Sequence, residues 1–362
     1  MQDSYRRCDN KMKILYGVCG EGFGHSSRAD TVSSLFADEH EILFASSKKA
    51  YAYLTSQKKK VIEINYSVKH AEMKENKIDY LATAWKNKDI LKGYAFVPKL
   101  LKLIKKFNPD LVISDFEPLT AITARLSKTP LLSFDHQNII TRTKIDVPRE
   151  YYLEYLVAKV IIENMVKNAD HYLISSFFFP KIIKKKTTLL PTILRENIFS
   201  VKPENKNFTL VYQSCVQIER LLNILKKVPK EKFVVYDERK KEKRLGNITL
   251  KPQSKEGFIK DLASSKAVIT TGGDNLISEA IYSKKPLLST PISGHFEQTL
   301  SAYYMEKLGY GKYYETLDEV KIIGFLNNLD EYKKKLKKVE WNKNKVFVRK
   351  FRNITKNLIT ND

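Results

Sequence analysis

The chain has 362 residues, 43% of them apolar, which predicts a large buried core divided between two domains. Its 64 lysines and arginines against 41 acids give a formal net charge of +23. Such a charge favours anionic partners, or it reflects only a lysine-rich solvated surface. No stretch approaches about 18 uncharged apolar residues, so no transmembrane helix is predicted. Three cysteines show neither metal-ligand spacing nor an even disulfide set, which favours a cytoplasmic protein over a secreted one.

The N-terminal half alternates short apolar runs with helical patterns. Residues 1–11 lack the apolar core of a signal peptide and are predicted to form a disordered leader. From residue 12 to 194 the patterns predict strands at 13–18, 40–45, 60–64, 110–114, 130–134 and 171–175, and helices at 25–37, 89–107, 118–127 and 150–167. This alternation is typical of a parallel sheet with helices on both faces.

The alternation lapses over 195–207, a predicted linker, and restarts over 208–344. There the patterns predict strands at 208–213, 232–237, 247–251, 266–271 and 286–291, and helices at 216–227, 256–264, 275–283 and 295–308. A charged run at 237–244 is predicted to be a solvated connection. Residues 345–362 are predicted to form a basic helix, a candidate to pack back onto the N-terminal domain. The predicted fold class is α/β, with two Rossmann-like, doubly wound parallel-sheet domains facing each other across a cleft.

The stretch VITTGGDNLISEA, residues 268–280, carries the strongest motif. Gly272 and Gly273 form a tight turn between a buried strand and a helix, whose free N–H groups suit a diphosphate. Asp274 is interpreted as the N-cap of that helix. Glu279, further along, is suited to accept hydrogen bonds from ribose hydroxyls. Downstream, Glu297 and Gln298 offer an acceptor and an amide for sugar hydroxyls.

These residues resemble the nucleotide-sugar site of GT-B glycosyltransferases of the MurG and UDP-glucuronosyltransferase types. The stretch from Met12 to Ala29 and the run PDLVISDFEP at 109–118 are similar to an uncharacterised MurG-like branch of archaea and bacteria. The resemblance implies the GT-B fold over nearly the whole chain. It also implies a donor-binding set consisting of Ser214, Thr271, Gly272, Gly273, Glu279, His295, Glu297 and Gln298.

Near the N-terminus, Gly20, Gly22 and Gly24 precede His25. Their G-x-G-x-G spacing, and the lack of an acid after the second predicted strand, disfavour a nicotinamide dinucleotide site. The resemblance implies that the glycines let this loop approach the donor phosphates and the acceptor. An imidazole can accept a proton from a sugar hydroxyl at cellular pH, although His25 could equally cap the helix or contact a phosphate.

Four polar residues follow the predicted strands at 110–114 and 130–134. Asp115 ends its strand, where its carboxylate could orient His25, and it forms the catalytic pair with His25 in this hypothesis. Glu117, Asp135 and His136 are further candidates for the acceptor side, or structural caps.

The sequence therefore predicts a glycosyltransferase that moves a sugar from a nucleotide diphosphate, expected to be a UDP-sugar, to a hydroxyl of a lipid or cell-envelope saccharide. Inversion is implied by the resemblance. The chain has no D-x-D pair, so neither an obligatory metal nor a cofactor is predicted. The alternatives are a UDP-sugar 2-epimerase-like isomerase, a nucleic-acid-directed glycosyltransferase or binder, and an inactive nucleotide-sugar sensor.

Three segments mix basic and apolar residues, at 99–106, 181–186 and 332–356. Such segments can lie on anionic lipid, which would place the protein peripherally on the inner face of the membrane. Each could equally be the solvated face of a core helix.

Overall fold

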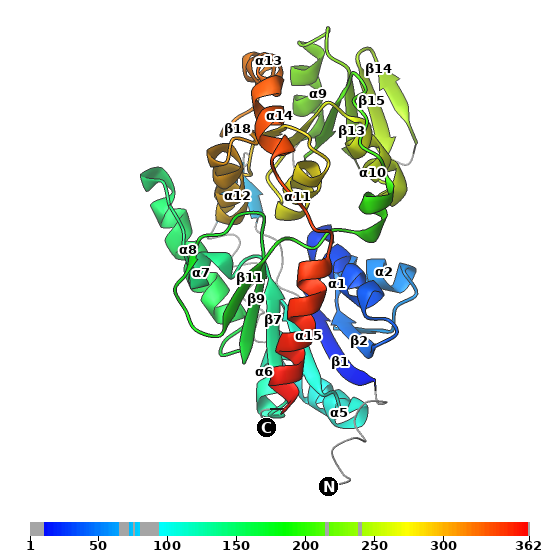
Figure 1. The fold of residues 1–362 in the computed structure, drawn as a ribbon, viewed down its shortest axis with the longest axis vertical. Coiled ribbons are helices and arrows are strands. Elements are labelled where there is room, and N and C mark those ends of the chain that lie inside the picture. The colour runs from blue at the N-terminus through cyan, green and yellow to red at the C-terminus, as the bar shows by residue number, and fades with distance from the viewer. Residues whose placement is uncertain are drawn as a thin grey trace.

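The computed structural model describes residues 11–64, 72–74, 77–79, 94–213, 217–237 and 241–360. Figure 1 shows two α/β halves stacked along the long axis of the molecule. The strands are β1 Met12–Val18, β2 His40–Ser46, β3 Val61–Glu63, β4 Glu72–Lys74, β5 Lys77–Asp79, β6 Leu111–Asp115, β7 Leu131–Asp135, β8 Thr143–Lys144, β9 His171–Ser175, β10 Lys181–Ile182, β11 Thr187–Leu190, β12 Thr209–Tyr212, β13 Phe233–Asp237, β14 Lys243–Leu245, β15 Ile248–Pro252, β16 Ala267–Thr270, β17 Leu287–Ser289 and β18 Gly311–Tyr313. The helices are α1 Phe23–Leu35, α2 Lys48–Ser56, α5 Val97–Phe107, α6 Pro118–Leu126, α7 Ile139–Arg142, α8 Tyr152–Met165, α9 Ile218–Lys226, α10 Lys255–Ser264, α11 Asp274–Tyr282, α12 Phe296–Lys307, α13 Glu319–Asn327, α14 Leu329–Lys337 and α15 Lys345–Thr360, with 3-10 turns η1 Arg149–Tyr151 and η2 Glu196–Ser200.

Each half is built on one seven-stranded sheet. The first has the order β11-β9-β7-β6-β1-β2-β3, and all of its strands are parallel. The second has the order β14-β15-β13-β12-β16-β17-β18 and is parallel except for β14 at its edge. Two parallel-sheet α/β domains of the predicted class are therefore confirmed.

The central strand β1 shows why these apolar runs form strands. Ile14 and Tyr16 belong to one buried cluster and Leu15 to another, because successive side chains point to opposite faces of the sheet. All three are fully buried. Helices cover both faces, so a run without polar alternation is what such a strand requires.

Part of the charged run at 237–244 was predicted as a connection but forms a strand. Residues 238–240 lie outside the described residues, whereas β14 pairs antiparallel with β15, Lys243 opposite Leu250 and Leu245 opposite Ile248. A charged strand is suited to a sheet edge, because lysines there face water and discourage further pairing. Charge alone therefore did not exclude strand structure at this position.

Helix α15 returns to the N-terminal half, and Figure 1 shows it running along that half towards α5 and α6. Phe351 stacks on Phe36 with ring centroids 4.7 Å apart, and Phe347 stacks on Phe134 at 5.2 Å. Both α15 rings are buried in the same cluster as β1. The last helix thus completes the first core and ties the two halves together.

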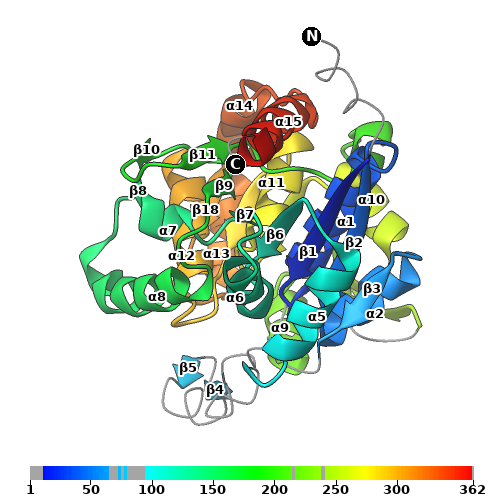
Figure 2. The ribbon, with the colours of Figure 1, turned by 90° about the horizontal axis from the view of Figure 1, so that it is seen from below.

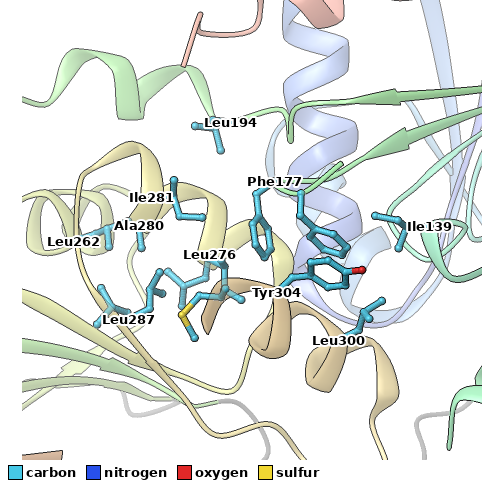
Figure 3. Close-up of a cluster of buried hydrophobic side chains, with 14 of the residues drawn as sticks. Ile139, Phe177, Leu194, Leu262, Leu276, Ala280, Ile281, Leu287, Leu300 and Tyr304 are labelled. Carbon is cyan, nitrogen blue, oxygen red and sulfur yellow. The ribbon is translucent and has the colours of Figure 1, made fainter. Parts of the chain in front are cut away.

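The two halves also share a buried apolar cluster, which Figure 3 shows between elements of both. Phe178 of the first half stacks on Tyr304 of α12 with centroids 4.1 Å apart. Other members come from α7 and the segment after β9 on one side and from α11 and α12 on the other: Ile139, Ile140, Phe177, Leu276, Ile277 and Leu300. This contact holds the carboxyl edges of the two sheets against each other. Among the described helices, none has the length and hydropathy needed to cross a bilayer.

Candidate active site

The first turn of α1 meets the end of β6. Asp115 is the last residue of β6, and it pairs in register with Val18 at the end of β1. His25 lies on the helix that follows β1, so its ring reaches the same edge of the sheet. Its Nδ1 lies 2.6 Å from Asp115 Oδ1. The structure thus brings together the two residues that the sequence proposed as a pair.

Arg28 completes this group. Its Nε lies 2.8 Å from Asp115 Oδ2 and its terminal nitrogen lies 2.6 Å from Oδ1, a bidentate pair. Burial alone would raise the pKa of the Asp115 carboxyl, but Arg28 and His25 outweigh it and hold that pKa below the ordinary value of 3.8. Sequence reasoning missed Arg28. Its i+3 spacing from His25, on one face of a helix, was the available signal.

The His25 side chain is 14% exposed, whereas Asp115 is fully enclosed. The ring stacks on Phe116, with centroids 6.2 Å apart and planes at 14°. Gln137 Nε2 lies 3.4 Å from His25 Nε2. When Nδ1–H donates to Asp115, Nε2 carries the lone pair, so this nitrogen is the one that can accept a proton from a bound molecule.

The three glycines before His25 serve different needs. A Cβ on Gly20 would lie 2.0 Å from Ser47 Oγ, so this residue permits close approach of the loop after β2. Gly22 has φ +81°, a conformation that favours glycine, and within the described part of the chain its ideal Cβ has no neighbour within 4 Å. Gly24 O accepts a hydrogen bond from Asn275 Nδ2 at 3.1 Å. The first turn of α1 therefore contacts the second half directly.

On the second half, Gly272 and Gly273 join β16 to α11. Gly272 has φ +97°, and a Cβ there would lie 2.8 Å from the Gln298 backbone oxygen. Gly273 is exposed, and no atom of the described residues lies within 4 Å of its ideal Cβ. Thr271 is buried beside them. The turn thus brings the start of α11 to an open position whose first N–H groups have no acceptor within the helix.

Asp274 does not cap α11, and that interpretation is wrong. Gly273 is the N-cap, and it makes no side-chain capping bond. Asp274 Oδ2 instead accepts from Thr192 Oγ1 at 3.1 Å, and Oδ1 lies 3.4 Å from His136 Nδ1. Burial raises the pKa of this carboxyl, although His136 draws it down. The side chain turns towards the N-terminal half because that half supplies polar partners.

Glu279 is buried on α11 and pairs bidentately with Arg195 from the segment that joins the halves. Arg195 Nε lies 2.7 Å from Oε1, and its terminal nitrogen lies 2.6 Å from Oε2. A carboxylate offers about four lone-pair sites, so two remain for other donors. Arg195 therefore fixes the orientation of the Glu279 carboxylate and leaves lone-pair sites for other donors.

The remaining predicted donor residues gather at the start of α12. His295 is the N-cap position, and Glu297 follows in the first turn. Gln298 Oε1 accepts from Ile292 N at 3.1 Å, which holds the preceding loop. Ser214 lies outside the described residues.

The structure gives the predicted acceptor-side residues structural partners. Glu117 is the N-cap of α6 and accepts hydrogen bonds from the Leu119 and Thr120 amides. Asp135 is fully buried and accepts from Ser133 and Asn138. These contacts are those of structural caps, which the sequence left open as the alternative, and a role of the two carboxylates on the acceptor side stays a prediction.

His136 is also buried, in the interface between the halves. Its Nδ1 lies 2.8 Å from the Ser175 carbonyl oxygen, and its Nε2 lies 3.4 Å from Ser301 Oγ of α12.

Two cavities of about 580 and 530 Å³ lie elsewhere, one beside α15 and one between η1 and α12, and neither is lined by the predicted site residues.

Comparison with known proteins decides the family. The family model described as "Glycosyl transferase family 1" matches residues 12–330. The chain belongs to this family. Two relatives, described as uncharacterized glycosyltransferases from Methanosarcina acetivorans and Methanosarcina mazei, are each 28% identical to it; they align over 85% and 91% of this chain and over 88% and 93% of their own lengths.

Solved glycosyltransferases share the fold of this family 1 member. The glycosyltransferase of kitacinnamycin has a TM-score of 0.63 at 15% identity, covering 90% of this chain and 93% of its own. The Streptomyces sp. SF2575 glycosyltransferase SsfS6, complexed with thymidine diphosphate, has a TM-score of 0.58 at 16% identity, covering 91% and 96%. The chain is a glycosyltransferase with the GT-B fold.

Proposed function

We propose that this glycosyltransferase moves a sugar from a nucleotide diphosphate, expected to be a UDP-sugar, to a hydroxyl acceptor. The observation that carries the proposal is the partly exposed His25 ring, held by its Nδ1 against a buried carboxylate. When Nδ1–H donates to Asp115, the lone pair of the other ring nitrogen lies at the edge where the two sheets meet, 3.4 Å from Gln137 Nε2. The resemblance to inverting enzymes and the polar side chains of α11 and α12 support the rest.

In the proposed reaction His25 Nε2 accepts the proton of the acceptor hydroxyl as that oxygen attacks the anomeric carbon. The new C–O bond forms on the face opposite the nucleotide, and the bond to the diphosphate oxygen breaks with its electron pair leaving on the diphosphate. Configuration therefore inverts. Asp115 stabilises the imidazolium, and Arg28 keeps Asp115 ionised and fixed.

We propose that the start of α11 receives the leaving diphosphate. The exposed Gly273 leaves room for it, and the helix N-terminus attracts its charge. Glu279 would accept hydrogen bonds from the ribose, and its pair with Arg195 sets its orientation. The thymidine diphosphate complex of SsfS6 supports a nucleotide diphosphate as the ligand class.

The acceptor is proposed to be a lipid or a cell-envelope saccharide on the inner face of the membrane, reached from the cytoplasm. We propose that catalysis needs no metal: the chain has no D-x-D pair, and the described residues contain no cluster of three His, Cys, Asp or Glu side chains suited to hold a metal ion. Activity that survives excess EDTA is expected. A complete loss that magnesium reverses would overturn this part.

The first test is a thermal-shift screen over nucleoside diphosphates and their sugars. A ligand that binds the folded state raises the melting temperature by mass action. The best donor is then incubated with and without candidate acceptors. Transfer that requires an acceptor supports the proposal, whereas conversion of the sugar nucleotide alone would identify an epimerase, and binding without turnover would identify a sensor.

Glu279→Ala tests the donor site. Losing charge-assisted hydrogen bonds should weaken nucleotide binding by about 1.5–3 kcal/mol, measured by calorimetry. Glu319→Ala on α13, whose carboxylate pairs only at the surface with Lys227, is the matched control and should leave affinity unchanged. Equal affinity in the two variants would remove Glu279 from the site.

A further inference from the structure

The structure separates the three basic and apolar segments. In the segment 99–106, Leu100 and Ile104 are buried in the core, and in 332–356 Leu336, Phe347 and Phe351 are buried. These two segments are faces of core helices. In 181–186, by contrast, Ile182 is 40% exposed and Ile183 58% exposed. Among the three segments, only 181–186 presents large apolar side chains to solvent.

Helix α8 lies near this segment and is apolar on two opposite faces. One face, with Tyr155, Ala158 and Ile162, packs on the shared cluster. The other presents large side chains that are 40–72% exposed, namely Tyr152, Leu153, Leu156, Val160 and Ile161. A surface helix normally turns one apolar stripe to the core and a polar face to water. A second apolar stripe indicates a surface that contacts something else.

The two features form one surface, which we name the α8–β10 face. It consists of the five exposed α8 side chains together with Phe179, Ile182 and Ile183. Lys184, beside Ile183, pairs with Glu163 of α8 at 2.8 Å, which ties the segment to the helix. Figure 1 shows α8 projecting at the side of the molecule, and Figure 2 shows the same helix at the periphery from below.

We propose that the α8–β10 face docks on an anionic lipid bilayer. Residues 152–186 carry six lysines against three acids, and 179–186 contains four lysines and no acid. Apolar side chains that enter the headgroup region, with lysines beside them, match the chemistry of anionic lipid. A second copy of this face would bring like charges together, and nucleic acid would not cover eight large apolar side chains.

The α8–β10 face lies close to the predicted donor residues, so docking would have a consequence for the site. Tyr155, on the packed side of α8, lies against Phe296 at the start of α12 with ring centroids 5.6 Å apart. The predicted donor residues Glu297 and Gln298 follow directly. Docking through α8 would therefore hold the site close to the bilayer. This consequence rests on the proposed lipid acceptor, whereas the docking itself does not.

The test is co-sedimentation of the full chain with phosphatidylcholine vesicles, with and without phosphatidylglycerol, in the absence of donor and acceptor. The expected result is binding only to the anionic vesicles, weakening as salt rises. The double variant Leu153→Asp/Val160→Asp should lower the bound-to-free ratio about tenfold or more. Lys181→Gln/Lys185→Gln should reduce binding to anionic vesicles several-fold, about as expected from losing two surface charges.

Val320→Asp is the matched control. Val320 is an apolar side chain on α13 that is 74% exposed and lies outside the face. The Val320→Asp variant should bind vesicles like the parent chain. All variants should show the same thermal shift with nucleotide as the parent, which separates docking from the proposed reaction. Absent binding, equal binding to neutral vesicles, or undiminished binding of the α8 variant would overturn the proposal. A dimer that Val160→Asp dissociates would assign the face to a second copy and also overturn it.

Discussion

Two carboxylates at equivalent places in the first sheet have opposite ionisation behaviour. Asp115 ends β6 and Asp135 ends the neighbouring strand β7, and both are fully buried. Burial raises the pKa of Asp135 above 3.8, because its partners are the neutral groups of Asn138 and Ser133. Burial opposes ionisation of Asp115 as well, but the Arg28 guanidinium and His25 lower its pKa below 3.8. The charge of the neighbour, not the depth of burial, decides between them.

The histidine beside each carboxylate differs in the same way. His25 is partly exposed and contacts the ionised group, so it has the surroundings of a base. His136 is 1% exposed and spans the interface between the halves. The end of β6 therefore contacts the histidine that we propose as the base, whereas the histidine that follows β7 lies in the contact between the two halves.

The largest effect is expected for Asp115→Asn. It leaves the buried Arg28 without its counter-ion, which should lower the free energy of unfolding by about 3–5 kcal/mol. Turnover should fall by about 10²–10⁴, because the imidazolium loses its stabilising charge. Denaturant unfolding and initial rates measure the two effects. If Asp115→Asn lowered the free energy of unfolding by less than Asp135→Asn does, the contrast drawn between the two carboxylates would be wrong.

Arg28→Lys should have an intermediate effect. It keeps a positive charge but loses the bidentate geometry, so the free energy of unfolding should fall by about 1.5–3 kcal/mol. Lys59, whose ammonium pairs with Asp30 at a partly exposed position, supplies the matched control Lys59→Arg. Equal stability of the two variants would show that the geometry of the Arg28 pair is unimportant.

Asp135→Asn should cost least, about 0.5–1.5 kcal/mol, because the amide oxygen can still accept from the Asn138 backbone N–H. The bonds that Ser133 and the Asn138 side chain donate to the other oxygen are lost, but the buried charge disappears as well. Turnover should stay within a few-fold of the parent, which initial rates would check. A loss comparable to that of the Asp115 variant would place Asp135 in the reaction after all.

The pH dependence of unfolding sharpens the same contrast. A lowered pKa gives stability that is present above 3.8 and lost as pH falls through the folded value, so the deficit of Asp115→Asn should shrink in acid. A raised pKa gives stability that is present below 3.8 and lost as pH rises, so Asp135→Asn should gain relative to the parent with rising pH. The free energy of unfolding of each variant is measured relative to the parent between about pH 3 and 7. With rising pH this difference should become more unfavourable for Asp115→Asn and more favourable for Asp135→Asn. If both differences changed with pH in the same direction, the opposite pKa shifts assigned to Asp115 and Asp135 would be wrong.

The fold was largely predictable because strand and helix periods are local. The parallel strands β1, β2, β6, β7 and β9 follow from apolar runs alone, and Asp115 was placed at the sheet edge because it ends one of them. Side-chain partners were not predictable, since they depend on which elements meet. Asp274 was interpreted as a cap from its position, yet it bonds Thr192, which lies 82 residues earlier.

The same limit applies to exposure. The helical pattern at 150–167 predicted α8, but its periodicity cannot tell a face packed on the core from a face left in water. Equally, Glu117 and Asp135 both looked like rim carboxylates, because sequence shows where a strand ends and not where the side chain turns.

The most direct test of the central claim is single-turnover sugar transfer by His25→Gln at saturating donor, with nucleotide affinity measured by calorimetry on the same protein. Glutamine keeps a hydrogen-bonding side chain but cannot act as a base near neutral pH. The account predicts a rate lower by about 10²–10⁴ with little change in affinity. His171→Gln, at the amino end of β9 and therefore at the opposite edge of the first sheet, should behave as the parent. A near-normal rate in His25→Gln would contradict the account and move the search for the base away from α1.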